Sequence, residues 1–183
     1  MRTLLIISII LGIFSTLVGQ ENYITRDGYI RFYSHTPIED IKADNNHVGS
    51  IINPATGEIV FTLKMIDFNF EKKLMQRHFN DKFVESDKFP KSTFKGFITD
   101  NDKVDYSVAG TYPVVVEGEL TIHGVTRTIR TSGIIEVISA GIKGMSGFII
   151  RPADYDIKIP KIVRNKIAEE MEITVKMAYE PME

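Results

Sequence analysis

The sequence contains no cysteine. A chain without thiols forms no disulfide, holds no metal through thiolates and has no cysteine nucleophile, so its fold must rest on its hydrophobic core. It also has no N-terminal cysteine that could be acylated. The four histidines form neither an H-x-H pair nor an HExxH motif, so the sequence predicts no metal site and no cofactor.

The sequence also lacks a basic excess and the common catalytic signatures. Lysine and arginine number 22 against 24 acidic residues, which argues against a nucleic-acid partner. No G-x-S-x-G elbow or phosphate-binding loop is present. Ser34 and His35 are adjacent, and in a strand they would point to opposite faces, a poor arrangement for a nucleophile and its base. We therefore expect a protein that is not an enzyme.

The N-terminus is typical of an export signal. Arg2 precedes an apolar run over residues 4–18, and polar sequence begins at Glu21. This pattern predicts a secretory signal peptide over residues 1–20, cleaved near Gly19 or Gln20. The run is short for a membrane span of roughly 20 residues, although an uncleaved anchor is the alternative. We expect a periplasmic or secreted protein with no stable membrane span after cleavage and one domain over residues 21–183.

Alternation of apolar and polar residues dominates the rest of the chain. Ile59, Phe61 and Leu63 share one face of a predicted strand, and the phase shifts by one residue after Met65. Such a shift is typical of a β-bulge, which helps a sheet to curve. Alternation over residues 104–108 suggests a further strand, and Gly133 separates two strands predicted after residue 125.

The predicted fold is all-β and mainly antiparallel, with one or two short helices over residues 71–79 and 160–171. Strands recur at near-regular spacing without intervening helices, which favours an extended up-and-down barrel of about eight strands. Closure removes exposed sheet edges. The interior of such a barrel is either filled by side chains or holds one slender ligand.

Three segments, in order, resemble the YceI-like family of small bacterial barrels associated with polyisoprenoid binding. They are Met75, His78-Phe79, Phe83, Phe89-Pro90 and Phe94; Gly118 to Arg127, with a predicted hairpin turn at Gly124; and Arg151, Asp154, Tyr155 and Ile157. The sequence departs from the family pattern at Asp156, where glycine is usual. The resemblance implies a lipocalin-like barrel that holds a long isoprenoid chain in an apolar channel.

The candidate ligand-binding residues are mostly large and apolar, and each aromatic could instead serve only to pack the core. They are Phe61, Phe68, Phe70, Met75, His78, Phe79, Phe83, Phe94, Phe148 and Arg151. For His78 a half-buried hydrogen-bonding role is the favoured alternative, and for His123 at the hairpin turn a structural role is expected. Arg151 is expected first in a buried ion-pair cluster with Asp154 and Tyr155, and second at a ligand head group.

The leading functional hypothesis is an exported, non-enzymatic binding protein for a polyisoprenoid or similar amphiphilic lipid. One alternative is an interaction or structural module with a solidly packed barrel and no ligand. The other is a lipid-modifying enzyme that depends on His78. The expected partner is an isoprenoid or other long-chain lipid and not nucleic acid. The sequence leaves open the ligand's length and head group and whether the chain is a monomer or a homodimer.

Overall fold

A computed structural model describes residues 22–182, so the predicted signal peptide and its cleavage site lie outside the described residues. These residues contain nine strands. They are β1 (Tyr23–His35), β2 (Asp40–Ile52), β3 (Glu58–Lys64), β4 (Asn69–Phe70), β5 (Lys91–Ile98), β6 (Gly110–Ile122), β7 (Val125–Ile138), β8 (Gly141–Ile150) and β9 (Met171–Pro181). Every pairing is antiparallel, and the sheet order is β1-β9-β8-β7-β6-β5-β3-β2-β4. Because β1 also pairs with β2, eight strands close into a barrel and β4 adds to the edge of β2.

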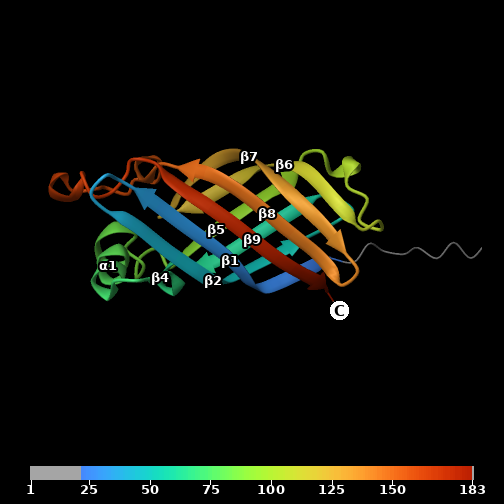
Figure 1. The fold of residues 1–183 in the computed structure, drawn as a ribbon, viewed down its shortest axis with the longest axis horizontal. Coiled ribbons are helices and arrows are strands. Elements are labelled where there is room, and N and C mark those ends of the chain that lie inside the picture. Colours follow the sequence, from blue (N-terminus) through green and yellow to red (C-terminus); the bar gives the residue numbers. More distant parts are fainter. Residues whose placement is uncertain (1–21, 183) are drawn as a thin grey trace, which may run out of the picture.

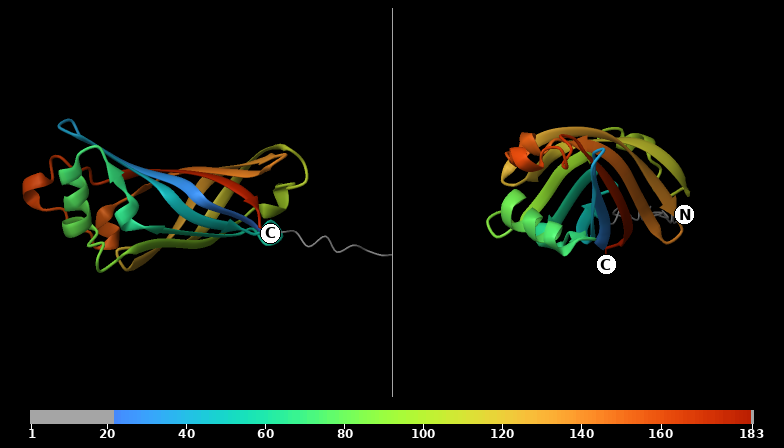
Figure 2. Two further views of the ribbon diagram at one scale, coloured as in Figure 1. Left: turned by 90° about the horizontal axis from the view of Figure 1, so that it is seen from below. Right: turned by 60° about the vertical axis from the view of Figure 1, so that its left-hand side comes forward.

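The closed barrel is elongated, and its two ends differ (Figure 1). Helix α1 (Lys73–His78) and the loop between β8 and β9 cover one end. Strand β9 ends at the opposite end of the barrel (Figure 2). The predicted antiparallel barrel of about eight strands with a short helix near residues 71–79 is therefore confirmed. No helix among residues 22–182 is long and apolar enough to cross a membrane.

Alternation along β5 shows how the sequence builds the barrel wall. Ser92, Phe94, Gly96 and Ile98 are buried, and the residues between them are exposed. Gly96 lies opposite Gly118 of β6, and a Cβ at either position would collide with the backbone of the other strand. The ring of Phe94 lies 2.7 Å from both Cβ positions, so the two glycines let the strands approach closely beneath an aromatic ring.

A two-residue turn joins β6 to β7. His123 and Gly124 have φ angles of +52° and +75°, and positive φ at both central residues is the pattern of a type I′ hairpin. The hairpin predicted from Gly124 is confirmed. The non-glycine residue His123 also adopts the left-handed region, which its contacts, described below, hold in place.

Three local predictions were wrong. The phase shift after β3 is a 3-10 turn over Met65–Asp67 and not a bulge; it buries Met65 and Phe68 and leaves Ile66 54% exposed. Residues 104–108 lie outside any strand, in a loop that begins with a 3-10 turn over Asn101–Lys103. β7 is continuous through Gly133, where two strands were predicted, because Gly133 pairs with both neighbouring strands.

The helix predicted over residues 160–171 is also wrong. That segment contains a single 3-10 turn, Lys161–Val163, followed by irregular chain. Ile162 is 87% exposed, whereas Val163 and Ile167 face a cavity below them. Val163 and Ile167 therefore pack separately against the barrel. They do not form the continuous buried face that would stabilise a helix here.

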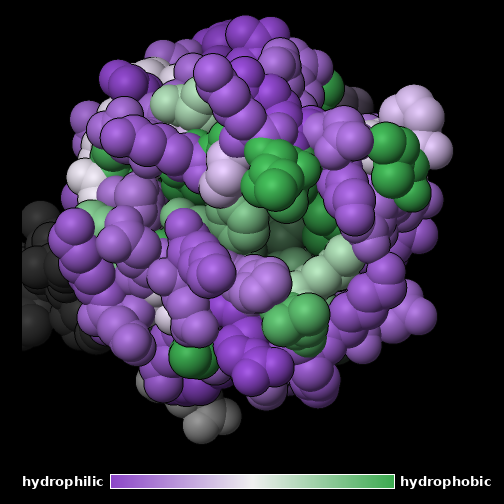
Figure 3. All heavy atoms as spheres, turned by 90° about the vertical axis from the view of Figure 1, so that its left-hand side faces the viewer, coloured by the Kyte–Doolittle hydropathy of each residue, from purple (hydrophilic) through white to green (hydrophobic). Residues whose placement is uncertain are grey.

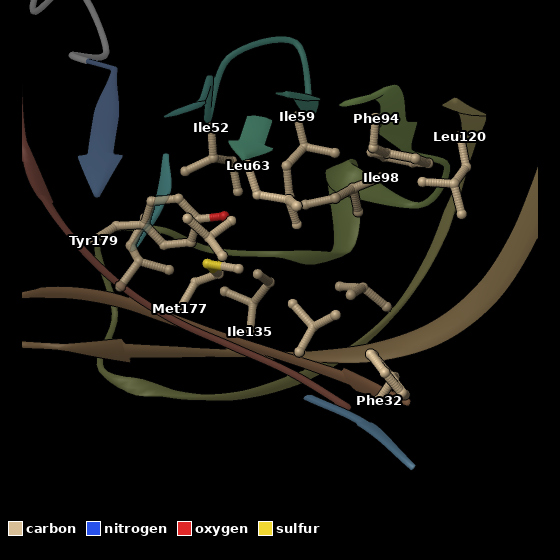
Figure 4. Close-up of a cluster of buried hydrophobic side chains, with 14 of the residues drawn as sticks. Phe32, Ile52, Ile59, Leu63, Phe94, Ile98, Leu120, Ile135, Met177 and Tyr179 are labelled. Carbon is tan, nitrogen blue, oxygen red and sulfur yellow. The ribbon is translucent and has the colours of Figure 1, made fainter. Parts of the chain in front are cut away.

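The end of the barrel near the C-terminus is filled by side chains. Figure 4 shows Ile52, Ile59, Ile135, Met177 and Tyr179 converging there, and they come from β2, β3, β7 and β9. The fully buried hydroxyl of Tyr179 lies 2.8 Å from Ser50 Oγ, so the one polar group in this packing has a partner. The interior is thus closed at this end.

Candidate functional site

A cavity of about 470 Å³ occupies the half of the barrel beneath α1. Its walls come from every strand except β7, together with α1 and the loop between β8 and β9. The lining is apolar apart from a few side chains: Glu39, Lys72, His78, Ser92 and Lys166. Figure 3 looks onto this end and shows a hollow with apolar side chains inside a hydrophilic surface. A volume of this size lies within the usual range of small-molecule sites.

An aromatic cluster forms one wall of the cavity. The ring of Phe79 stacks on Phe32 of β1 with centroids 5.4 Å apart, and it lies 5.0 Å from the ring of Phe70 on β4. Phe68 completes the cluster, 5.7 Å from Phe79. Phe79 belongs to the π-helical turn Phe79–Phe83 that follows α1. The cluster therefore attaches the segment that covers the cavity to the barrel wall.

Seven of the ten candidate residues line this cavity. They are Phe68, Phe70, Met75, His78, Phe79, Phe83 and Phe148. Phe61 and Phe94 line a second cavity of about 100 Å³ deeper in the barrel, where their rings pack edge to face 5.9 Å apart. Phe148 lines both cavities. The nine candidates other than Arg151 therefore occupy two adjoining levels of one interior.

Arg151 lies apart from the other candidates. Its side chain is 62% exposed, lines neither cavity, and donates a 3.0 Å hydrogen bond from Nε to Glu170 Oε1. Asp154 is exposed as well, and only Tyr155 is buried. The buried ion-pair cluster expected for these three residues is therefore wrong, because the partner of Arg151 is a surface carboxylate from the loop before β9.

Charged side chains lie at the rim of the large cavity. Lys72 Nζ donates a 2.7 Å hydrogen bond to Glu39 Oε1, linking the segment before α1 to the hairpin between β1 and β2. This bond lowers the pKa of the Glu39 carboxyl, and Lys166 acts in the same direction. Lys166 and His78 also line the cavity. An apolar chamber with charged groups at its rim suits a molecule with an apolar chain and a polar end.

His123 connects the three segments that carry the family resemblance. Its Nδ1 lies 3.1 Å from the carbonyl oxygen of Tyr155, its Nε2 lies 3.0 Å from Glu85 Oε2, and its ring lies 4.3 Å from that of Phe89. Arg127 adds a 2.9 Å hydrogen bond from Nε to the Asp154 carbonyl oxygen. His123 therefore has the expected structural role, fastening both covering segments to the β6–β7 hairpin.

Sequence reasoning missed much of the cavity wall. The missed residues include Ile30, Phe32, Glu39, Ile41, Leu63, Lys72, Leu120, Ile122, Lys166 and Ile173. The missed residues that lie on strands are at the inward-facing positions of the alternating pattern, so that pattern alone could have identified them. Glu39, Lys72 and Lys166 come from connecting segments, and no pattern in the sequence brings them together.

Among residues 22–182, no group of three or more His, Asp or Glu side chains is placed to hold a metal ion. Glu39 and Lys72 are paired with one another at the rim. The chemistry of the cavity is therefore apolar burial with a charged border.

A YceI-like domain model matches residues 26–179 of the chain. Solved structures share the fold at low sequence identity. A polyisoprenoid binding domain from Saccharophagus degradans, implicated in plant cell wall breakdown, is 16% identical with a TM-score of 0.77, covering 89% of this chain and 99% of its own. BcnA of Burkholderia cenocepacia is also 16% identical, with a TM-score of 0.69 and coverage of 81% and 94%.

The YceI protein of Campylobacter jejuni is 20% identical with a TM-score of 0.62, covering 81% of this chain and 90% of its own. At these identities the likeness establishes the fold alone. No curated protein matches the sequence.

Proposed function

The chain belongs to the YceI-like family, and from that premise we propose that it is an exported, non-enzymatic protein that binds a polyisoprenoid or similar amphiphilic lipid. The observation that carries the proposal is the apolar cavity of about 470 Å³ with charged groups at its rim. The structural relative from Saccharophagus degradans is described as a polyisoprenoid binding domain, which supports the same class of ligand here.

Apolar contact alone can supply the affinity that such a function needs. Burial of one CH₂ group contributes about 0.8 kcal/mol, so ten of them contribute about 8 kcal/mol before the cost of association. A net gain of about 8 kcal/mol corresponds to a dissociation constant of about 1 μM, and a chain longer than ten carbons supplies further apolar burial against the cost of association. Apolar burial is thus the main source of affinity, and the rim groups Lys72, Lys166 and His78 would serve to orient a polar head.

The two alternatives have less support. A solidly packed module would have no room for a ligand, whereas only the C-terminal end of this barrel is filled. A lipid-modifying enzyme would need reactive groups inside the cavity, and His78, the last residue of α1, lies at the rim, with Ser92 as the one hydroxyl-bearing side chain among the lining residues. Ser92 Oγ donates a 2.8 Å hydrogen bond to the Thr121 carbonyl oxygen, so its hydroxyl proton is already engaged.

Export is proposed from the signal-like N-terminus. The two parts of the proposal are tested separately. Fractionation of a host that expresses the full chain should place the processed protein outside the cytoplasm. Native mass spectrometry of the mature chain beginning at Glu21, followed by organic extraction, should then reveal a bound isoprenoid or quinone-like lipid. A protein that is purified empty and binds no added prenyl lipid would contradict the binding function. The same spectra would report whether the protein is a monomer or a homodimer.

A further inference from the structure

We propose that a ring of side chains midway along the barrel limits the prenyl chain that the cavity accepts to about three five-carbon units. This inference rests on the proposed lipid-binding function. It concerns the boundary between the two cavities, where one set of residues lines both.

Five residues make up this ring: Ile30, Leu63, Ser92, Leu120 and Phe148. They come from β1, β3, β5, β6 and β8, so they surround the interior. Leu63, Ser92 and Leu120 are each less than one-tenth exposed and are held by the packed wall. Phe148 is the largest member and is only half-buried, so its ring is the side chain that narrows the passage.

The depth available outside the ring follows from strand geometry. Inward side chains are two residues apart, and on a tilted barrel strand each step advances about 5 Å along the axis. Outward from Ile30, Phe32 lies one step away on β1, and Ile41 on β2 is at the second step because it pairs with Ser34. Glu39, two residues before Ile41, lies at the third step and at the rim. The chamber is therefore about 15 Å deep by the same steps. A prenyl unit adds four chain bonds, or about 5 Å.

Little space remains inside the ring. The inner cavity is about 100 Å³ against about 470 Å³ outside it. Beyond it, the fully buried side chains of Ile52, Ile142 and Tyr179 close the barrel. A fourth prenyl unit must therefore displace Phe148 or stay at the rim in contact with water. In either case each further unit adds much less to the affinity, because less of its apolar surface is removed from water.

The test uses the full mature protein and prenyl alcohols of two, three, four and nine units, which compete with a fluorescent prenyl probe. We expect affinity to rise at least tenfold from two units to three, and to change less than threefold from three to four or nine. Phe148→Ala joins the two cavities, so the four-unit alcohol should then bind at least tenfold more tightly than the three-unit alcohol. Phe148→Leu tests the same change with a smaller loss of packing, should the alanine variant fail to fold.

Two further variants isolate the ring. Val116 is half-buried and lines only the inner cavity, so Phe148→Ala combined with Val116→Phe should refill that space and restore the original plateau. Phe97 lies on β5 with its side chain outside the barrel, 50% exposed, and Phe97→Ala is the matched control that should leave the length profile unchanged.

Affinity that keeps rising to nine units in the unmodified protein would overturn the inference while leaving the lipid-binding function in place. An unchanged profile in both Phe148 variants would also overturn it. If no prenyl alcohol displaced the probe and the probe itself did not bind, the proposed function would fail and this inference with it.

Discussion

Phe79→Ala tests whether the aromatic cluster holds the covering segment over the cavity. The substitution removes a ring that contacts Phe32, Phe68 and Phe70 at centroid distances of 5.0 to 5.7 Å. A fully buried phenylalanine costs about 3–5 kcal/mol when truncated to alanine. Phe79 is half-buried beside an existing cavity, so we expect a smaller loss of about 2–3 kcal/mol.

Thermal and urea unfolding of the mature protein measure this loss. For a chain of this size 1 kcal/mol shifts the melting temperature by about 2–4 °C, so a decrease of about 4–12 °C is expected. Phe97→Ala, which removes a half-exposed ring from the outer face of β5, should cost no more than about 1 kcal/mol. Hydrogen exchange of the backbone amides in α1 should accelerate in Phe79→Ala and not in Phe97→Ala.

A prenyl lipid should also raise the melting temperature of Phe79→Ala less than that of the unmodified protein, because Phe79 lines the cavity and stabilisation by a ligand increases with its affinity for the folded state. The reasoning is refuted if Phe79→Ala and Phe97→Ala lose equal stability and α1 keeps its protection in both. That outcome would mean that the covering segment is held by other contacts.

Three further predictions concern the packed end, the barrel surface and the hairpin turn. Tyr179→Phe should cost about 1–3 kcal/mol in urea unfolding because it leaves the buried hydroxyl of Ser50 without a partner, and adding Ser50→Ala should recover part of that loss; an additive double variant would contradict this. The hydrogen bond from Arg31 lowers the pKa of the Asp44 carboxyl, so its stabilising effect should be complete above the ordinary aspartate pKa of about 3.9 and disappear as the pH falls through the lowered value; Asp44→Asn should then match the unmodified protein in acid unfolding and differ from it at pH 7. His123→Ala should increase limited proteolysis in residues 79–90 and 151–170 while far-UV circular dichroism stays unchanged, and equal cleavage patterns would show that the turn does not fasten these segments.

Much of the barrel could be predicted from the sequence because a strand has a period of two residues. Ile59, Phe61 and Leu63 on β3 and Phe94 and Ile98 on β5 have the inward phase that their alternation predicts. Gly124 identified the β6–β7 turn because a two-residue hairpin requires positive φ. These features depend on neighbours within a few residues, so the local sequence carries the information.

The local errors have a common cause. Apolar residues in 160–171 were spaced as for a helix, but Val163 and Ile167 are satisfied by separate contacts over the cavity mouth. Arg151 was expected among buried groups, and its partner Glu170 is 19 residues away in an irregular loop. The contacts that bury or pair such residues come from other segments of the chain. The local sequence pattern does not show where those segments lie in the fold.

Most of the strands, their inward faces, the hairpin turn and the family resemblance can be predicted from the sequence alone. The folded barrel was needed to show that one end is filled and the other hollow, that Phe79 reaches Phe32 on the first strand, and that Phe148 lies at the boundary between two cavities. An inward phase follows from backbone geometry within one strand. The volume left empty depends on how eight tilted strands, far apart in the sequence, place their side chains at the same level of the barrel.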